Sequence, residues 1–347
     1  MLHGGEIYGK KIEYDFSVNL NPYPCPDKVR EALTRAVSDV GQYPDMSQTL
    51  FREAIASSKG DNISADNVIG GNGASELISA VVRLIAPKKV LLPVPSFYGY
   101  RHALNMIPDC KIEEYLLDSR DGFELTETFL QKITDKTDLI ILANPNNPTG
   151  KCISDDILSK ILYRCKETKT AIILDECFFD LSSGRASGEK YVGIIPDLFV
   201  INAYTKLFAI PGVRIGYAIS GKKEIEALKK FLPEWNMSIF SQKAGCACAD
   251  IVRNSDYVSK SLDYINSQKE ELIKSLSRFT VYDSDTNYIL MQTDIDIFDR
   301  LLKNGILIRD CSNFIGLKKG FYRIAVKDPR AIKALTDALR FFELTTS

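Results

Sequence analysis

Histidine is scarce in this sequence of 347 residues, which contains only His3 and His102. So few histidines argue against a histidine-rich metal centre and leave little material for a Ser-His or Cys-His nucleophile. If the chain is an enzyme, we therefore expect a bound cofactor to supply its chemistry. The sequence also lacks an apolar run of about 18 residues, the length that a membrane-spanning helix needs, and its N-terminus has no apolar signal region. We expect a cytoplasmic protein without a membrane partner.

An excess of charge of either sign is missing as well. The sequence has 44 basic and 45 acidic residues and a formal net charge of -1, so nothing in its composition points to nucleic acid or to an anionic membrane. Its eight cysteines form no Cys-x-x-Cys pair. In a protein without a secretory signal such cysteines are expected to be reduced thiols, most of them in the core.

The order of predicted elements indicates two domains. Between residues 68 and 219, short apolar strands alternate with helices, a pattern typical of an α/β fold with a mainly parallel sheet covered on both faces. After Pro233 the pattern changes to that of a smaller α+β domain. We therefore predict an N-terminal arm over 1–30 that packs with the small domain, a large domain over 31–235 and a small domain over 236–347. One long helix over about 241–277 is expected to connect the two domains.

A lysine stands at the end of an apolar strand. Residues 198–201 lead into the turn that carries Lys206, and Arg214 precedes a second apolar run. A buried ammonium is costly unless it is paired, neutralised or made covalent. Lysine is also the Schiff-base residue of carbonyl and pyridoxal phosphate (PLP) chemistry. A surface lysine and a salt-bridged arginine would fit this stretch equally well, so the choice depends on the rest of the chain.

Three more loops follow strands at the sheet edge where open α/β sheets bind their ligands. The glycine-rich turn at 70–75 opens a helix and suits a phosphate, although an ordinary strand-to-helix turn looks the same. The loop at 144–150 contains three asparagines and two prolines, which fix the backbone and aim amide groups at one spot. Asp175 ends a buried strand and needs a cationic partner, for which a protonated pyridine nitrogen would serve. A helix cap or a local ion pair is the alternative for this aspartate.

In this order and spacing, the motifs resemble the class I and II aminotransferases, a family of PLP enzymes. The resemblance rests on Asn-Pro-Asn-Asn-Pro-Thr-Gly at 144–150, on Asp175-Glu176, and on Thr205-Lys206 followed by Gly-x-Arg-x-Gly-Tyr at 212–217. It extends over nearly the whole chain. It implies the fold type I architecture, with a mainly parallel sheet in a large domain and a smaller α+β domain, and it implies PLP as the cofactor.

The resemblance also implies a role for each motif residue. Lys206 would hold PLP covalently, and Asp175 would pair with the pyridine nitrogen. Asn147 would donate a hydrogen bond to the ring oxygen O3′, and Phe97 would stack on the ring. The cofactor phosphate would be bound by Gly73, Ala74, Ser75, Thr205 and Arg214, and Tyr43 would reach the phosphate in the neighbouring subunit of a homodimer.

Two residues depart from the family pattern. Ala203 stands three residues before the lysine, where the family usually has a serine or threonine that binds the cofactor phosphate. Thr205 could compensate for this missing hydroxyl. Phe178 stands three residues after the aspartate, where a tyrosine often donates to O3′. These departures suggest a pocket tuned away from ordinary transamination.

Within the family, the sequence most resembles the threonine-phosphate decarboxylases of cobalamin biosynthesis, which are relatives of the histidinol-phosphate aminotransferases. The signals are His3-Gly4-Gly5, the Asn19-x-Asn21-Pro22 segment, and Ile-Leu-Ile-Arg-x-Cys-x-Asn at 306–313. By this resemblance His3 and Arg309 would meet a substrate phosphate, while Asn19 and Arg323 would orient the amino-acid end. His3 could equally be a disordered terminal residue.

The resemblance predicts decarboxylation of O-phospho-L-threonine to (R)-1-amino-2-propanol phosphate. Phosphoserine differs by one methyl group and stays open as a second substrate. The alternative is an aminotransferase that acts on histidinol phosphate and 2-oxoglutarate. A non-catalytic PLP-binding module is disfavoured, because all the motif residues that the chemistry needs are present.

Overall fold

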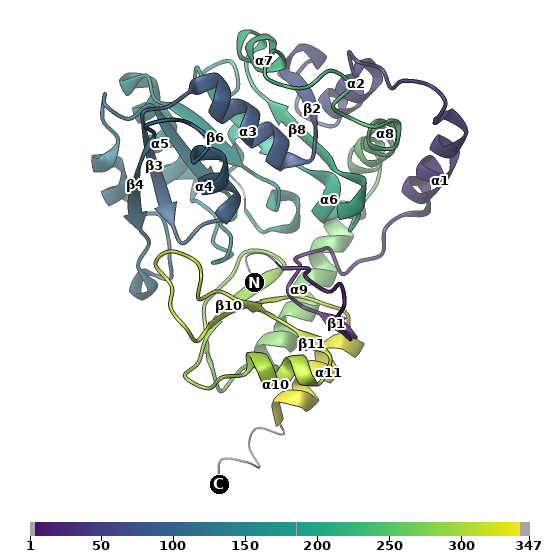
Figure 1. The fold of residues 1–347 in the computed structure, drawn as a ribbon, viewed down its shortest axis with the longest axis vertical. Coiled ribbons are helices and arrows are strands. Elements are labelled where there is room, and N and C mark those ends of the chain that lie inside the picture. Colours follow the sequence, from purple (N-terminus) through teal and green to yellow (C-terminus); the bar gives the residue numbers. More distant parts are fainter. Residues whose placement is uncertain (1–3, 185, 341–347) are drawn as a thin grey trace.

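A seven-stranded sheet forms the centre of the larger body of the molecule (Figure 1) in the computed structural model, which describes residues 4–184 and 186–340. Its strands are, in spatial order, β2 (Val68–Asn72), β8 (Ile215–Ile219), β7 (Leu198–Asn202), β6 (Ala171–Asp175), β5 (Leu139–Ala143), β3 (Lys89–Val94) and β4 (Lys111–Leu116). The five strands from β7 to β4 are parallel, whereas β8 runs antiparallel to both of its neighbours. The expected mainly parallel α/β sheet is therefore confirmed.

Helices cover both faces of this sheet. Except for the edge strand β4, the strands are buried almost throughout, which is why they read as continuous apolar runs such as Ile-Ile-Leu in β5 and β6. One face packs against α3 (Ala74–Ile85), α4 (Tyr98–Leu104) and α7 (Lys222–Lys229). The other face packs against α2 (Thr49–Ser57), α5 (Asp155–Thr168) and α8 (Ile239–Asn254), and α1 (Asp27–Ala36) packs on the outer side of α8.

The strand directions bring several loops to one edge of the sheet. Strands β3, β5, β6 and β7 are parallel, and β2 points the same way because it is two antiparallel pairings away from β7. The carboxyl end of β7 continues through Ala203 into the short helix α6 (Tyr204–Leu207), which carries Lys206. The loops after β2, β3, β5 and β6 therefore end near this lysine.

The smaller body contains a four-stranded antiparallel sheet (Figure 1). The strand order is β12 (Arg309–Asp310), β13 (Phe321–Ala325), β10 (Tyr288–Gln292) and β9 (Thr280–Val281). Helices α9 (Tyr257–Ser275), α10 (Phe298–Lys303) and α11 (Pro329–Arg340) pack with it in a core of its own. Asp328 caps α11 by accepting hydrogen bonds from the amides of Arg330 and Ala331, as its place before Pro329 predicts.

The N-terminal segment lies against the smaller body before it crosses to the larger one. Strand β1 (Tyr14–Asp15) pairs in parallel with β11 (Ile306–Leu307), and Phe16 is buried in the small-body core. Asn21 then contacts the turn around Lys206, because its backbone N–H donates to the Lys206 carbonyl oxygen at 3.1 Å. The segment thus passes over the boundary between the two bodies.

The connecting helix differs from the expected one. Residues 241–277 form two helices, α8 and α9, which are separated at Ser255 and Asp256. Ser255 is extended, so it interrupts the continuous helical pattern that the composition suggests. The apolar face of α8, including Ala244 and Cys248, belongs to the core of the larger body. The larger body therefore extends beyond residue 235, where we expected it to end.

Candidate active site

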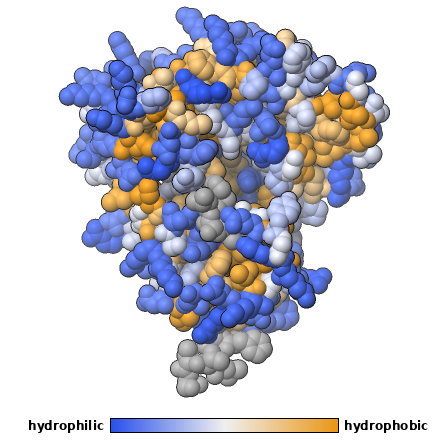
Figure 2. Space-filling view, in the orientation of Figure 1, coloured by the Kyte–Doolittle hydropathy of each residue, from blue (hydrophilic) through white to orange (hydrophobic). Residues whose placement is uncertain are grey.

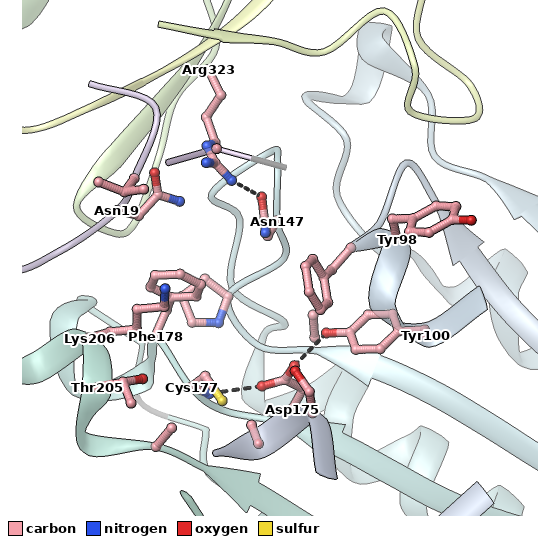
Figure 3. A pocket seen from close by; sticks show the side chains of 18 of the residues that line it. Asn19, Tyr98, Tyr100, Asn147, Asp175, Cys177, Phe178, Thr205, Lys206 and Arg323 are labelled. Carbon is pink, nitrogen blue, oxygen red and sulfur yellow. Dashed lines mark hydrogen bonds between the residues drawn. The ribbon is translucent and has the colours of Figure 1, made fainter. Parts of the chain in front are cut away.

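A cavity of about 260 Å³ lies where the two bodies meet. The face in Figure 2 is hollowed in this region, and Figure 3 shows the side chains that line the cavity. The lining includes most of the predicted site residues, namely Asn19, Ala74, Ser75, Phe97, Asn147, Asp175, Thr205, Lys206, Arg214, Arg309 and Arg323. Residues from five loops of the large sheet, from the N-terminal segment and from the small sheet therefore meet in one place.

The partly buried side chain of Lys206 enters this cavity from α6. Burial lowers the pKa of Lys206 to about 8, and the charges of Arg323 and Arg214 act in the same direction. Its Nζ atom lies 5.8 Å from the centre of the Phe178 ring. Near physiological pH an amine with such a pKa is still mostly protonated, but its neutral fraction is far larger than that of an ordinary lysine, so it can serve both as a nucleophile and as a proton carrier.

Asp175 lies at the tip of β6, one strand away from Lys206. Its Oδ1 accepts a hydrogen bond from the amide of Cys177 at 3.0 Å, and its Oδ2 accepts one from the Tyr100 hydroxyl at 2.7 Å (Figure 3). The carboxylate is therefore fixed by two donors, one on each oxygen. Each oxygen keeps acceptor capacity for a group in the cavity.

The start of α3 forms a second feature of the site. Gly73 precedes α3 with φ +80°, and a Cβ atom placed there would lie 2.2 Å from Nη2 of Arg214. Arg214 also has a positive φ, of 61°, and its guanidinium donates to the carbonyls of Pro211 and Asn72. A cation thus sits beside the free amides of a helix N-terminus, an arrangement that binds anions.

Two arginines reach the cavity from the small sheet. Arg309 of β12 and Arg323 of β13 are cross-strand partners, and both are buried, with exposed fractions of 2% and 6%. Arg323 donates to the Asn147 amide oxygen (Figure 3) and, at 2.6 Å, to the Ser17 carbonyl. Arg309 donates to Asn313 at 2.9 Å. Two guanidiniums so close together favour anionic ligands, because nearby negative charge offsets their mutual repulsion.

Buried polar atoms facing the cavity lack partners. Among the described residues, neither polar atom of the Asn19 side chain has a hydrogen bond, although Asn19 is only 2% exposed. The buried Nε atom of Arg323 also has no hydrogen-bond partner among the described residues. Unsatisfied buried polar groups are costly, so these atoms indicate a polar ligand between Asn19 and Arg323.

Four predicted features need separate comment. Tyr43 is 81% exposed and lies against Trp235, at a ring distance of 5.0 Å, rather than in the cavity. Its assignment to a neighbouring subunit stays a prediction. His3 lies outside the described residues. Ala203 and Phe178 both line the cavity, so the two departures from the family pattern stand beside Lys206.

Some lining residues were not predicted. Tyr98, Tyr100, Cys177 and Phe314 also contribute to the cavity. Tyr98 and Tyr100 could have been suspected, because both lie in the same Pro-Ser-Phe-Tyr-Gly-Tyr segment as Phe97. Nothing in the sequence signals Cys177 and Phe314.

The arrangement combines an amine of lowered pKa, a fixed carboxylate and several anion-binding groups. No cluster of three metal-binding side chains occurs within residues 4–184 and 186–340. Over the same residues, no helix has both the length and the apolar character to span a bilayer.

Known proteins match this chain over almost its full length. The family model for aminotransferase class I and II matches residues 11–339. The threonine-phosphate decarboxylase of Salmonella typhimurium is 30% identical over 94% of this chain and 90% of its own. A protein of Caldanaerobacter subterraneus subsp. tengcongensis, which carries the same assignment provisionally, is 34% identical over 97% of this chain and 93% of its own.

A solved structure matches as well. The histidinol-phosphate aminotransferase from Clostridium acetobutylicum superposes with a TM-score of 0.86 at 29% identity, over 95% of this chain and 99% of its own. The aminotransferase fold that the sequence predicts is thereby confirmed. Members of the matched family use PLP. The chain belongs to the class I and II aminotransferase family.

Proposed function

We propose that this chain is a PLP-dependent threonine-phosphate decarboxylase, which converts O-phospho-L-threonine into (R)-1-amino-2-propanol phosphate. The main structural support is the buried cross-strand pair of Arg309 and Arg323, next to Lys206. The substrate carries a carboxylate and a phosphate a few bonds apart, and two neighbouring guanidiniums complement two such anions. The relatives from Salmonella and Caldanaerobacter support the same reaction.

The donor set of the cavity fits PLP. Lys206 offers an amine with a pKa of about 8, as covalent attachment to an aldehyde requires. The start of α3, where Gly73 leaves room for Arg214, suits the cofactor phosphate. Asp175 would hold the proton of the pyridine nitrogen, Asn147 would donate to the ring oxygen and Phe97 would cover one ring face. When bound, PLP supplies an electron sink for the electron pair released at the substrate Cα.

The remaining residues bind and orient the substrate. Arg323 and Asn19 would bind the carboxylate end, since both have unsatisfied buried polar atoms. Arg309 would bind the phosphate, a role that the sequence also assigns to His3. Once carbon dioxide has left, Lys206 Nζ would deliver a proton to Cα. Phe178 stands beside this amine without a hydroxyl of its own.

We extend the proposal to the assembly and the pathway. Val37 and Val40, which follow α1 and are close in sequence to Tyr43, are exposed apolar residues, and Figure 2 shows a hydrophobic area on the side of the molecule where α1 lies. A second copy packed on this surface would bring Tyr43 to the neighbouring phosphate site of a cytoplasmic homodimer. The amino-propanol phosphate product would serve corrinoid assembly, as the sequence resemblance suggests.

The test incubates the PLP-loaded protein with O-phospho-L-threonine and no oxo acid. We expect carbon dioxide release that Lys206→Ala abolishes. A second arm supplies histidinol phosphate and 2-oxoglutarate, because the Clostridium structure favours aminotransfer as the alternative. Activity in the second arm alone would refute the decarboxylase. Phosphoserine in the first arm measures how strongly the pocket selects the extra methyl.

Arg309 offers a sharper test of substrate recognition. We expect Arg309→Gln to raise the KM for phosphothreonine by roughly 10- to 100-fold, because a charge-assisted contact to the phosphate is lost. Arg120→Gln is the matched control, since the Arg120 side chain is 87% exposed and, among the described residues, binds only Asp118. An unchanged KM in Arg309→Gln would exclude this arginine as a phosphate ligand.

A further inference from the structure

Tyr100 contacts the site from behind the Asp175 carboxylate. It belongs to α4, is 1% exposed, and donates its hydroxyl proton to Asp175 Oδ2 at 2.7 Å (Figure 3). The other oxygen, Oδ1, is held by the Cys177 amide at 3.0 Å. Because the two donors come from different elements, they fix the rotation of the carboxylate about its Cβ–Cγ bond.

The Cys177 donor is a backbone group next to the strand, so its position is set by β6 itself. The Tyr100 hydroxyl, in contrast, comes from a helix on one face of the sheet. Its hydrogen bond to Asp175 joins two residues that are 75 positions apart in the sequence. It is thus the side chain that a substitution can remove without changing the strand.

The same tyrosine supports the ring predicted to cover the cofactor. The rings of Phe97 and Tyr100 meet edge to face, at 5.6 Å and 84°. Edge-to-face contacts of this kind restrict the tilt of both rings. Tyr100 therefore contacts two groups that border the cavity, a carboxylate and an aromatic ring.

The Tyr100 hydroxyl keeps its proton around neutral pH and donates it to Asp175 in a hydrogen bond. Burial, and then the negative charge of Asp175, raise its pKa well above the usual value of 10. The nearby Cys177 and Tyr288 act in the same direction. Tyr100 is consequently suited to hold a charged acceptor and is unsuited to proton transfer.

We propose that Tyr100 is a positioning residue that orients the Asp175 carboxylate toward the pyridine nitrogen of PLP and, through Phe97, fixes the plane of the cofactor ring. This inference rests on the proposed function, because it requires PLP in the cavity. It predicts that the hydroxyl and the ring of Tyr100 have separable effects. The hydroxyl acts through Asp175, whereas the ring acts through Phe97.

The experiment removes the hydroxyl and keeps the ring. We expect Tyr100→Phe to bind PLP at least roughly 5-fold more weakly, because a hydrogen bond to a charged group is lost. The pH midpoint of the visible absorption of the PLP-loaded protein should move upward. Without the hydroxyl, more negative charge remains on Asp175, and the cofactor site holds its proton more strongly.

Tyr282→Phe is the matched control. It also deletes one phenol hydrogen bond, to Gln292 at 2.9 Å, but it lies outside the cavity lining. Its PLP affinity and spectral midpoint should equal those of the wild type. A general loss of stability would not move the midpoint, so this readout separates positioning from folding.

A double variant tests whether Tyr100 acts through Asp175. In an Asp175→Asn background, Tyr100→Phe should change the PLP affinity by less than about 2-fold, because coupled residues are not additive. The proposal is overturned if Tyr100→Phe keeps the wild-type midpoint and PLP affinity, or if its effect is undiminished in the Asp175→Asn background. A wild-type protein that develops no visible band with PLP would instead overturn the proposed cofactor.

Discussion

If the proposed function holds, the ionisation of Lys206 controls entry of the cofactor. Burial lowers its pKa to about 8, and the neutral amine is the form that attacks an aldehyde. We therefore predict that the rate of PLP capture by the cofactor-free protein rises with pH and levels off above a midpoint near 8. Stopped-flow absorbance after mixing with PLP measures this rate at each pH.

Two results would contradict this prediction. A midpoint near the ordinary lysine value of 10.5 would mean that the Lys206 amine is not desolvated. A visible band that forms equally fast in Lys206→Ala would mean that another amine captures PLP. If the rate of PLP capture rises with pH in the wild type and capture is lost in Lys206→Ala, the two results together identify Lys206 as the reacting group.

Sequence reasoning works well for residues at strand ends and poorly for residues that meet through tertiary packing. Lys206 and Asp175 could be found because each follows an apolar strand. The pairing of Arg309 with Arg323 depends on the register between β12 and β13, which residue types do not reveal. Tyr100 was missed because its hydrogen-bond partner is 75 residues away in the sequence.

At the scale of elements, the turn between β2 and α3 is where backbone geometry and anion binding coincide. Gly73→Ala would force a Cβ atom into Nη2 of Arg214, which must then shift. We expect PLP to bind roughly 10-fold more weakly, since a charge-assisted contact to the cofactor phosphate is disturbed. Equilibrium titration with PLP, followed by absorbance, measures the change.

Gly122→Ala is the control for the strain of the backbone alone. Gly122 also has a positive φ, of 63°, but a Cβ atom there would meet nothing within 4 Å. It should cost about 1 kcal/mol of stability and leave PLP affinity unchanged. Equal PLP affinity in the two alanine variants would show that the Gly73 turn does not support the phosphate site.

The helices α8 and α9 show why a helical sequence pattern does not determine where a helix ends. The composition of residues 241–277 suits one helix throughout, yet Ser255 is extended and separates α8 from α9. Tyr257 and Ile265 of α9 still pack in the core of the larger body with Ala244 of α8, whereas Leu272 near the end of α9 packs in the smaller one. The break lets the chain change direction before α9 crosses from the larger body to the smaller one, a tertiary requirement that local propensity does not contain.

Over the whole molecule, Asn21 links three segments that are far apart in the sequence. Its amide nitrogen Nδ2 donates to the Leu207 carbonyl at 2.8 Å and to the Ser261 hydroxyl at 2.9 Å, while its Oδ1 accepts from the Tyr23 amide. The N-terminal segment, the helix that carries Lys206 and α9 are thereby held together. Asn21 is 5% exposed, so water cannot replace these bonds easily.

We predict that Asn21→Ala lowers the free energy of unfolding by about 2–3 kcal/mol, because several buried polar groups lose their partners at once. PLP should also dissociate faster, since the turn around Lys206 loses an anchor. Asn254→Ala is the control: its exposed side chain binds only Asp250, and it should cost less than about 0.5 kcal/mol. If urea unfolding gives the two variants equal stability, the N-terminal segment does not hold the catalytic turn, and the boundary between the two bodies must be stabilised elsewhere.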